Sequence, residues 1–407
     1  MKLPTYPDCH LTYCTNIHPG ETWGDHFSQL KIYLPELKKR LSPDESFGIG
    51  LRLSATAAEQ LLKKDTLNAF RNWLDNEDLY LFTINGFPYG SFHGERVKDN
   101  VYTPDWSKRD RVEYTLNLIK ILSELLPDDM DGGISTSPIS YKYWSNNKPT
   151  DELFKISARH LAETAHAMAE TEKNRGKELH LDIEPEPDCL LENSSETIDF
   201  FTNWLFPIGS DYLVQTHGYS RVDAAKKLRR HIRVCYDTCH FALEYENPHK
   251  AIDDFIAAGI QIGKTQVSAA LKVILTWDDS FRKRIAARLQ KFDEPVYLHQ
   301  VIARTAEGAY KQFRDIPQAI GSIYDKDTEE WRIHFHVPVF IDQFDEMSST
   351  QDHILNSLKP LLERSGCKHF EIETYTWEVL PDQLKTDLKD SIEREFNWTL
   401  NAIEELN

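Results

Sequence analysis

Short apolar runs alternate with longer amphipathic runs along most of the chain, which predicts a parallel β-sheet with helical crossovers. Apolar positions recur at helical spacing over residues 107–126, 150–174, 195–205 and 248–258. The strand-like runs cover residues 11–17, 47–54, 79–85, 133–139, 179–184, 233–238, 262–269 and 370–374. Eight strands with helical crossovers favour a closed (β/α)8 TIM barrel, although an open doubly wound sheet has the same local pattern.

The alternation is interrupted between the seventh and eighth predicted strands, where roughly a hundred residues intervene. This interval is too long for an ordinary loop. We therefore expect an inserted subdomain over residues 272–345 within a single barrel domain of residues 1–407. Inside it, the sequence predicts a helix beginning near Asp278 and a pair of strands over 296–303 and 331–340.

Charge and composition argue against several classes of partner. The 407 residues carry a formal net charge of −18, whereas proteins that grip nucleic acid present a basic face. The amino terminus lacks the apolar core of a signal peptide, and no apolar run approaches membrane-spanning length. The six cysteines form no CxxC pair and fit reduced structural thiols. We expect a cytoplasmic protein that binds neither nucleic acid nor a membrane.

Three of the predicted strands end in carboxylates, namely Glu184, Asp237 and Glu373. The carboxyl ends of barrel strands meet at one rim, where TIM barrels keep their active sites. A divalent ion needs oxygen or imidazole ligands from several strand ends, because one strand cannot surround it. The three carboxylates are therefore expected to share a metal site. The alternative for each one alone is a helix cap or an ion pair with a lysine.

Histidines supply further candidates. His240 follows Asp237 by three residues and is expected to face the same cavity, unless it merely packs at the start of a helix. His334 and His336 form an H-x-H pair that places both rings on one face of a strand, a common metal-ligand arrangement. His336 lies nearer the strand's end and is the better candidate. The alternative is the polar face of a hairpin.

Polar residues at other strand ends are candidates for binding substrate. His18, Asn85 and His93 follow the first and third strands, where they can hydrogen-bond hydroxyl groups or serve only as turn residues. On the seventh strand, Lys264 and Gln266 alternate toward the barrel lumen. Lys264 either holds an anionic group or pairs with a carboxylate.

Several catalytic motifs are missing from the sequence. It contains no GxGxxG after a strand, no phosphate-binding GxxxxGK and no GxSxG nucleophile elbow. The sequence therefore does not favour a nicotinamide-dependent enzyme, a nucleotide-binding enzyme or a serine hydrolase. Metal or acid–base chemistry is favoured.

Glu184 on the fifth predicted strand, Asp237 with His240 on the sixth, and Glu373 on the eighth resemble the xylose isomerase-like TIM barrel superfamily. That superfamily includes ketose epimerases, inosose dehydratases and endonuclease IV repair enzymes. More narrowly, the chain resembles the EboE family of metabolite-traffic proteins. This resemblance rests on residues 11–23, 184–187, 237–240, 334–338 and 373–377 and spans nearly the whole chain.

The resemblance implies a divalent metal cofactor (Mn, Mg, Zn or Co) and two glutamates, Glu184 and Glu373, that also move protons. Where the epimerases have a metal-binding histidine on the seventh strand, this sequence has Gln266. An amide oxygen makes a weaker site than imidazole, unless His336 from the insertion completes it.

The leading hypothesis is a metal-dependent isomerase or epimerase that transfers a proton through an enediolate. Its substrate would be a sugar or cyclitol in secondary-metabolite biosynthesis or traffic. Glu184 and Glu373 would remove and return the proton, and His240 would orient a hydroxyl. His18, Asn85, His93, Lys264 and His336 would contact the substrate, and Glu184, Asp237, Gln266, His336 and Glu373 would hold the metal.

Two alternatives remain open. The first is a non-catalytic barrel that binds or hands over a metabolite, which the Gln266 departure favours, with other proteins of the same gene cluster as partners. The second, an endonuclease IV-like phosphodiester hydrolase, is disfavoured by the acidic charge and by missing histidine ligands.

Overall fold

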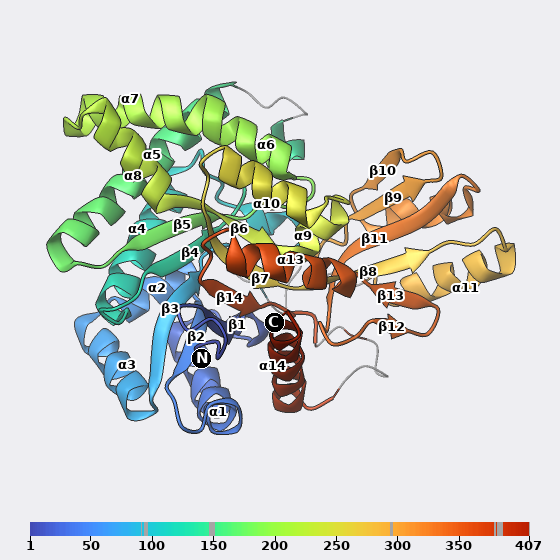
Figure 1. The fold of residues 1–407 in the computed structure, drawn as a ribbon, viewed down its shortest axis with the longest axis horizontal. Helices are drawn as coiled ribbons and strands as arrows, with labels where there is room; N and C mark the ends of the chain where they lie inside the picture. The colour runs from blue at the N-terminus through green and yellow to red at the C-terminus, as the bar shows by residue number, and fades with distance from the viewer. Residues whose placement is uncertain are drawn as a thin grey trace.

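An eight-stranded parallel sheet forms the centre of the molecule (Figure 1). The computed structural model describes residues 1–90, 92, 97–145, 151–293, 296–377, 380 and 386–406. The strand order is β1-β14-β7-β6-β5-β4-β3-β2, and a bridge between Cys14 and Gly50 joins the two outer strands. The sheet thus nearly closes into a TIM barrel, which confirms the predicted fold class. Its strands are β1 (His10–Tyr13), β2 (Phe47–Arg52), β3 (Leu79–Asn85), β4 (Gly132–Thr136), β5 (Leu179–Ile183), β6 (Ile232–Asp237), β7 (Ile262–Val267) and β14 (His369–Ile372).

Helices connect the strands and cover the outside of the barrel (Figure 1). The predicted helix over 107–126 is α4 (Arg109–Leu125), and that over 248–258 is α10 (Pro248–Ala257), capped by the Asn247 side chain. The others are α1 (Trp23–Leu41), α2 (Ala55–Leu61), α3 (Lys64–Asn76), α5 (Asp151–Arg175), α6 (Ser194–Asp199), α7 (Phe206–His217), α8 (Arg221–His231), α9 (Thr238–Leu243), α13 (Gln351–Glu363) and α14 (Leu388–Glu404).

Alternation along the strands gives the barrel a polar interior. On β5, Leu179, Leu181 and Ile183 join the apolar core, while His180 and Asp182 face inward. A Cβ atom added at Gly263 of β7 would lie 2.0 Å from Asp182 Oδ1, so that glycine makes room for the carboxylate. β6, β7 and β14 follow the same pattern, and polar groups therefore extend from the rim to the base of the barrel.

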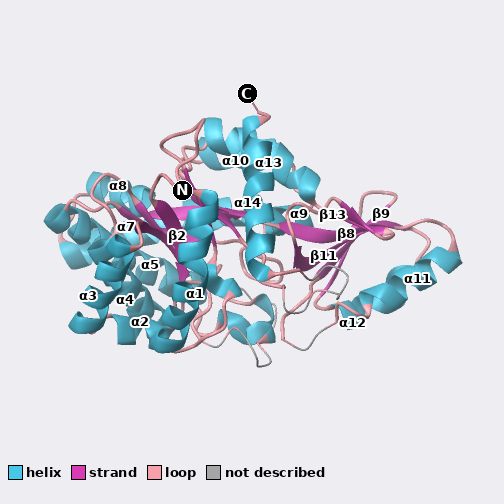
Figure 2. Cartoon of the chain, turned by 90° about the horizontal axis from the view of Figure 1, so that it is seen from below, coloured by secondary structure: helices cyan, strands magenta, loops and turns pink. Residues whose placement is uncertain are grey.

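A second, antiparallel sheet lies beside the barrel (Figure 2). Its order is β10-β9-β11-β8-β13-β12. The predicted strand over 262–269 ends at Val267, and Ala269 begins the first strand of this second sheet. Its elements are β8 (Ala269–Ile274), α11 (Asp279–Leu289, capped by Asp278), β9 (Val301–Thr305), β10 (Tyr310–Phe313), α12 (Ile316–Ala319), β11 (Thr328–Val337), β12 (Gln343–Phe344) and β13 (Met347–Ser349).

The strand pair expected in this region is β9 with β11, which run antiparallel. None of the helices in the described ranges combines the length and the apolar character that a membrane crossing requires.

Candidate functional site

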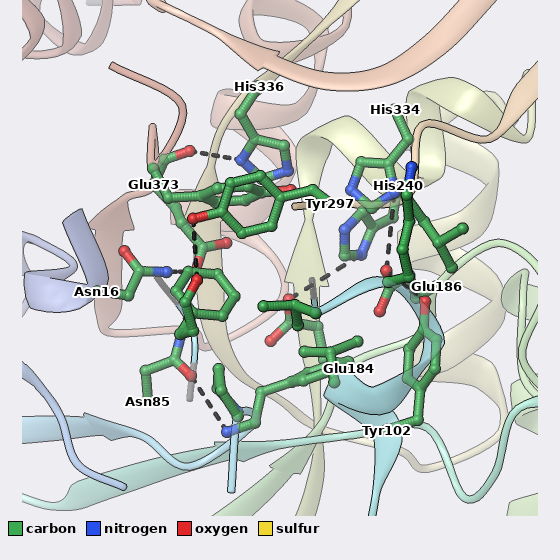
Figure 3. A pocket seen from close by; sticks show the side chains of 18 residues that line it. Asn16, Asn85, Tyr102, Glu184, Glu186, His240, Tyr297, His334, His336 and Glu373 are labelled. Atoms are coloured by element: carbon green, nitrogen blue, oxygen red, sulfur yellow. Dashed lines mark hydrogen bonds and ion pairs between the residues drawn. The ribbon is translucent and has the colours of Figure 1, made fainter. Parts of the chain in front are cut away.

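A cavity opens at the carboxyl ends of the barrel strands, and elements from both sheets build it (Figure 3). The barrel contributes Glu184, which follows β5, and Glu373, which follows β14. The second sheet contributes His334 and His336 from β11. Phe87, Phe92, Tyr102, Tyr297 and Tyr375 supply aromatic walls.

Three carboxylates converge beside this cavity. Glu184, Asp237 and Glu373 each offer an oxygen, and the three oxygens lie within 4.8 Å of one another. All three side chains are buried. Three negative charges at such short separations would repel one another strongly in a buried site. The carboxylates therefore need bound protons or a cation between their oxygens.

Asp237 divides its two oxygens between two tasks. Oδ1 caps α9, because it accepts hydrogen bonds from the backbone N–H groups of Cys239 (2.7 Å) and His240 (3.2 Å). It also accepts a bond from the Ser268 hydroxyl at 2.6 Å. Oδ2 is buried without a hydrogen-bond partner, 3.7 Å from His240 Nε2. The helix-cap interpretation of this residue is thus correct for one oxygen and leaves the other for a ligand.

Glu373 is held in place by two amides. Its Oε1 accepts hydrogen bonds from the side chains of Asn16 (2.8 Å) and Asn85 (3.0 Å), which come from opposite sides of the β1–β2 seam. Glu184 is less constrained, because its Oε2 is buried without a hydrogen-bond partner. One glutamate therefore has a fixed orientation, while the other has an oxygen available to a ligand.

Burial sets the protonation of these groups. It raises the pKa of Glu184 well above the usual range, and the nearby Glu373 and Asp237 raise it further. The pKa of Glu373 is raised in the same way by burial and by Asp237 and Glu371. For Asp237, burial alone would raise the pKa, but His240, His336 and the Ser268 hydroxyl together lower it below its ordinary value. The glutamates thus bind protons readily, while Asp237 stays ionised.

The histidines present their Nε2 atoms to the site. Backbone carbonyls accept from Nδ1–H of His240 (Pro185, 2.8 Å) and His336 (Glu373, 2.6 Å), which leaves the Nε2 atom of each ring to face the site. His334 Nδ1 bonds Gln300 Oε1 at 2.8 Å. Burial lowers the pKa of His336 to about 4 and that of His334 well below its ordinary value. Neutral rings with bonded Nδ1 atoms are the form in which histidine binds metals.

The donor set fits a divalent ion. Asp237, His240 and His336 form a second group whose ligand atoms lie within 4.8 Å, and it shares Asp237 with the carboxylate group. Carboxylate oxygens with imidazole nitrogens suit Mn²⁺, Zn²⁺ or Co²⁺, and the carboxylates alone suit Mg²⁺. The buried unpartnered atoms Glu184 Oε2, Asp237 Oδ2 and His336 Nε2 are those that an ion would satisfy.

Most residues predicted for the site lie in or beside it, and two lie elsewhere. Asn85, Glu184, His240, His336 and Glu373 line the cavity. Asp237 joins them through the carboxylate group. Gln266 pairs in register with Asp237, and its side-chain oxygen and nitrogen are buried without hydrogen-bond partners, so its role as a metal ligand stays a prediction. His93 lies outside the described residues.

His18 and Lys264 are not among the residues that line the cavity. The Tyr13 hydroxyl bonds His18 Nε2 at 2.8 Å, and the His18 ring stacks on Tyr33, so this histidine packs behind β1. The Lys264 ammonium lies 2.5 Å from Glu371 Oε2, and both side chains are fully buried. Direct substrate contact by these two residues stays a prediction, while the structure shows the His18 ring stacked on Tyr33 and Lys264 paired with Glu371.

The cavity also includes residues to which the sequence assigns no role. Glu186 accepts a hydrogen bond from the Tyr102 hydroxyl at 2.8 Å, and its Oε1 lies 3.7 Å from His334 Nδ1. Burial raises the pKa of Glu186 to about 7. The sequence offers one signal for Glu186, which is its position two residues after Glu184, a predicted site residue. Asn16 comes from the short helical turn Thr15–Ile17 and Tyr297 from a loop, and the local sequence does not predict that either reaches the cavity.

Comparison with known proteins adds fold neighbours. No family model matches the chain, and no curated protein matches it. Among solved structures, the IOLI protein with a bound zinc atom is similar over 97% of this chain and 98% of its own, with a TM-score of 0.48 and 13% identity. L-ribulose 3-epimerase has a TM-score of 0.47 and 12% identity, covering 98% of this chain and 95% of its own.

A xylose isomerase-like TIM barrel protein from Mycobacterium smegmatis, in complex with magnesium, has a TM-score of 0.47 and 10% identity, covering 96% of this chain and 98% of its own. The likeness to these three structures concerns the backbone alone. The resemblance to the EboE family stays a prediction.

Proposed function

We propose that this protein holds a divalent metal ion at the barrel rim and catalyses proton transfer on a small polyhydroxylated carbonyl compound, as an isomerase or epimerase. The observation that carries the proposal is the convergence of Glu184, Asp237 and Glu373 on one buried place beside the cavity. A protein tolerates three adjacent buried carboxylates when a cation or a proton-transfer reaction uses them.

Each residue has a distinct part. Asp237 Oδ2 and His336 Nε2 would hold the ion together with the glutamates. When bound, a divalent ion supplies Lewis-acid polarisation of a substrate carbonyl. The aromatic walls exclude water and can pack against the carbon face of a sugar or cyclitol.

The two glutamates fit the roles of base and acid. Their pKa values are raised by burial, which makes each carboxylate a stronger base than it would be in water. Asn16 and Asn85 fix Glu373, so its free oxygen keeps one direction toward the cavity. Glu184 would take the proton from the carbon next to the carbonyl and Glu373 would return it, while His240 orients a hydroxyl.

Solvent-exchange measurements test the proposal. Ketoses and cyclitol ketones are incubated in D2O with the protein and Mn²⁺, and deuterium at the carbon next to the carbonyl is measured by NMR. Glu184→Gln and Glu373→Gln are each expected to lower exchange by about 10²–10⁴-fold. Glu395→Gln is the matched control, because Glu395 is an equally buried glutamate bonded to Thr374 and Val339 outside the cavity.

Metal content is measured in parallel by elemental mass spectrometry. Asp237→Asn and Glu373→Gln should each lose about one equivalent of ion relative to wild type while remaining folded. Bound metal without exchange on any substrate would instead support a metabolite-binding barrel. An ion count that neither variant changes would refute the metal site at the rim.

A further inference from the structure

A second convergence of potential metal ligands lies at the opposite end of the barrel. Asp131 precedes β4, His180 lies on β5 and His369 begins β14, and one ligand atom from each lies within 4.8 Å of the others. The two histidines are almost fully buried, and Asp131 is the most exposed of the three, with 15% of its side chain accessible. These residues belong to the amino ends of the strands, away from the rim cavity, whose lining includes none of them.

The distances at this cluster are those of ligands around an ion. His180 Nε2 lies 3.6 Å from Asp131 Oδ2, and His369 Nε2 lies 3.6 Å from Asp131 Oδ1. Both separations are too long for good hydrogen bonds. Two atoms bound to Zn²⁺ at about 2.0–2.1 Å and at a tetrahedral angle lie about 3.3 Å apart. His180 Nε2 is fully buried, has no hydrogen-bond partner and faces Asp131.

His180 also has the support that metal-binding histidines have. Its Nδ1 lies 2.7 and 2.9 Å from the two oxygens of Asp182, so Nδ1–H donates to this carboxylate and Nε2 points at Asp131. A carboxylate behind a histidine orients the ring and strengthens it as a ligand. Gly133 leaves space for the two histidine rings, since a Cβ atom there would lie 2.7 Å from the His180 ring and 2.9 Å from His369 Nδ1.

Charges around the cluster balance if one divalent cation is present. Arg233 approaches Asp131 at 3.4 Å, but it also pairs with Glu178 at 2.6 Å. Asp131, which is partly exposed, and Asp182, which is fully buried, then remain as two carboxylates, one on each side of His180. A lone pair on Nε2 that faces a carboxylate is repelled by it, so the gap needs either a proton or a metal ion.

We propose that Asp131, His180 and His369 form a Zn²⁺ site at the base of the barrel, with Asp182 as the residue that positions His180. The two imidazole nitrogens and one carboxylate oxygen leave a fourth position toward the exposed side of Asp131. Such an ion would join β5, β14 and the segment before β4 across the barrel interior. Residues at this end of a TIM barrel usually stabilise the fold, whereas catalytic residues lie at the opposite end.

Zinc titration tests the site. Chelator-treated wild type, His369→Gln and His10→Gln are titrated with Zn²⁺ by calorimetry. His10 is the matched control, since it lies at the same end of the barrel but its Nδ1 is bonded to the Tyr80 hydroxyl at 2.7 Å. His369→Gln should bind about one equivalent fewer than wild type, and His10→Gln the same number. Asp182→Asn should bind the same number of zinc ions as wild type, but the affinity of this site should be about 10–100-fold lower.

Anomalous diffraction at the zinc edge decides the location without any variant. Crystals of zinc-loaded wild type should show a peak between Asp131, His180 and His369, separate from any peak at the rim. No peak at the base under saturating zinc, or an unchanged zinc count in folded His369→Gln, would overturn the proposal and leave His180 as a protonated link between two aspartates. Because rim ions give their own peak, failure here is distinguishable from failure of the proposed function.

Discussion

Replacing Lys264 by methionine removes the cation of an ion pair in the middle of the barrel. The ammonium lies 2.5 Å from Glu371 Oε2, and neither side chain is exposed. Burial lowers the pKa of Lys264, but the Glu371 carboxylate outweighs it and raises the pKa above the ordinary value. A lysine with a raised pKa contributes its full stabilisation below the unfolded-state pKa of about 10.4, so the pair is intact at pH 7.

The cost of breaking such a pair is large, because one charge is left buried without a partner. Removing one member typically costs roughly 3–5 kcal/mol. An unfolding entropy of about 2.1 cal/mol/K per residue gives about 0.85 kcal/mol/K for 407 residues, so Tm should fall by about 4–6 °C. Removing both charges in Lys264→Met/Glu371→Gln should restore Tm to within about 1–2 °C of wild type.

Differential scanning calorimetry at pH 7 on wild type, both single variants and the double variant measures this coupling. The control is Lys250→Met, since Lys250 pairs with Asp254 on the surface and its loss should shift Tm by less than about 1 °C. A Lys264→Met protein that melts with wild type, or a double variant that loses the sum of the single effects, would refute the argument.

Three further predictions test other parts of the structure. Gly50→Ala should lower Tm by several degrees, because its Cβ would lie 1.8 Å from Glu371 Oε1, whereas Gly24→Ala, with 3.8 Å to its nearest neighbour, should not. Burial raises the pKa of Glu395 to about 8, so the folded state retains a proton that the unfolded state releases above about pH 4.5. Stability should therefore fall between about pH 4.5 and 8, by at most about 1.4 kcal/mol per pH unit, and a pH series of melts should show a flatter profile for Glu395→Gln. Chelation should lower the Tm of wild type and Mn²⁺ should restore it, while the Tm of Asp237→Asn should respond to neither treatment, because the Asp237 carboxylate is missing as a ligand; a wild-type Tm that ignores both treatments would contradict an ion at the rim.

Local pattern was enough to predict the barrel and the convergence of three carboxylates at its rim. Strand periodicity depends on neighbouring residues only, so the eight strands and their order in the chain follow from it. Because parallel strands bring their carboxyl ends to one rim, Glu184, Asp237 and Glu373 were expected together, and their oxygens do converge. The observed strand bounds differ from the predicted ones where the chain reaches the rim. The predicted strand over residues 11–17, for example, ends at Tyr13, and a short helical turn follows over Thr15–Ile17.

The tertiary structure decided which way the polar residues face and what they meet. Alternation on β5 and β14 is the pattern of a half-exposed strand, yet barrel closure turns those polar positions inward, where Lys264 meets Glu371 and His180 meets Asp131. Partners such as these are 49–107 positions apart in the chain, and only register and closure bring them within 4 Å. The same holds for His334, which reaches the rim because β11 of the second sheet lies beside the barrel. The sequence by itself determined the strands and the chemistry at their ends, because these depend on local order. Closure of the barrel determined the partners of each buried charge, because a charge that is removed from water is unstable unless it is paired or hydrogen-bonded.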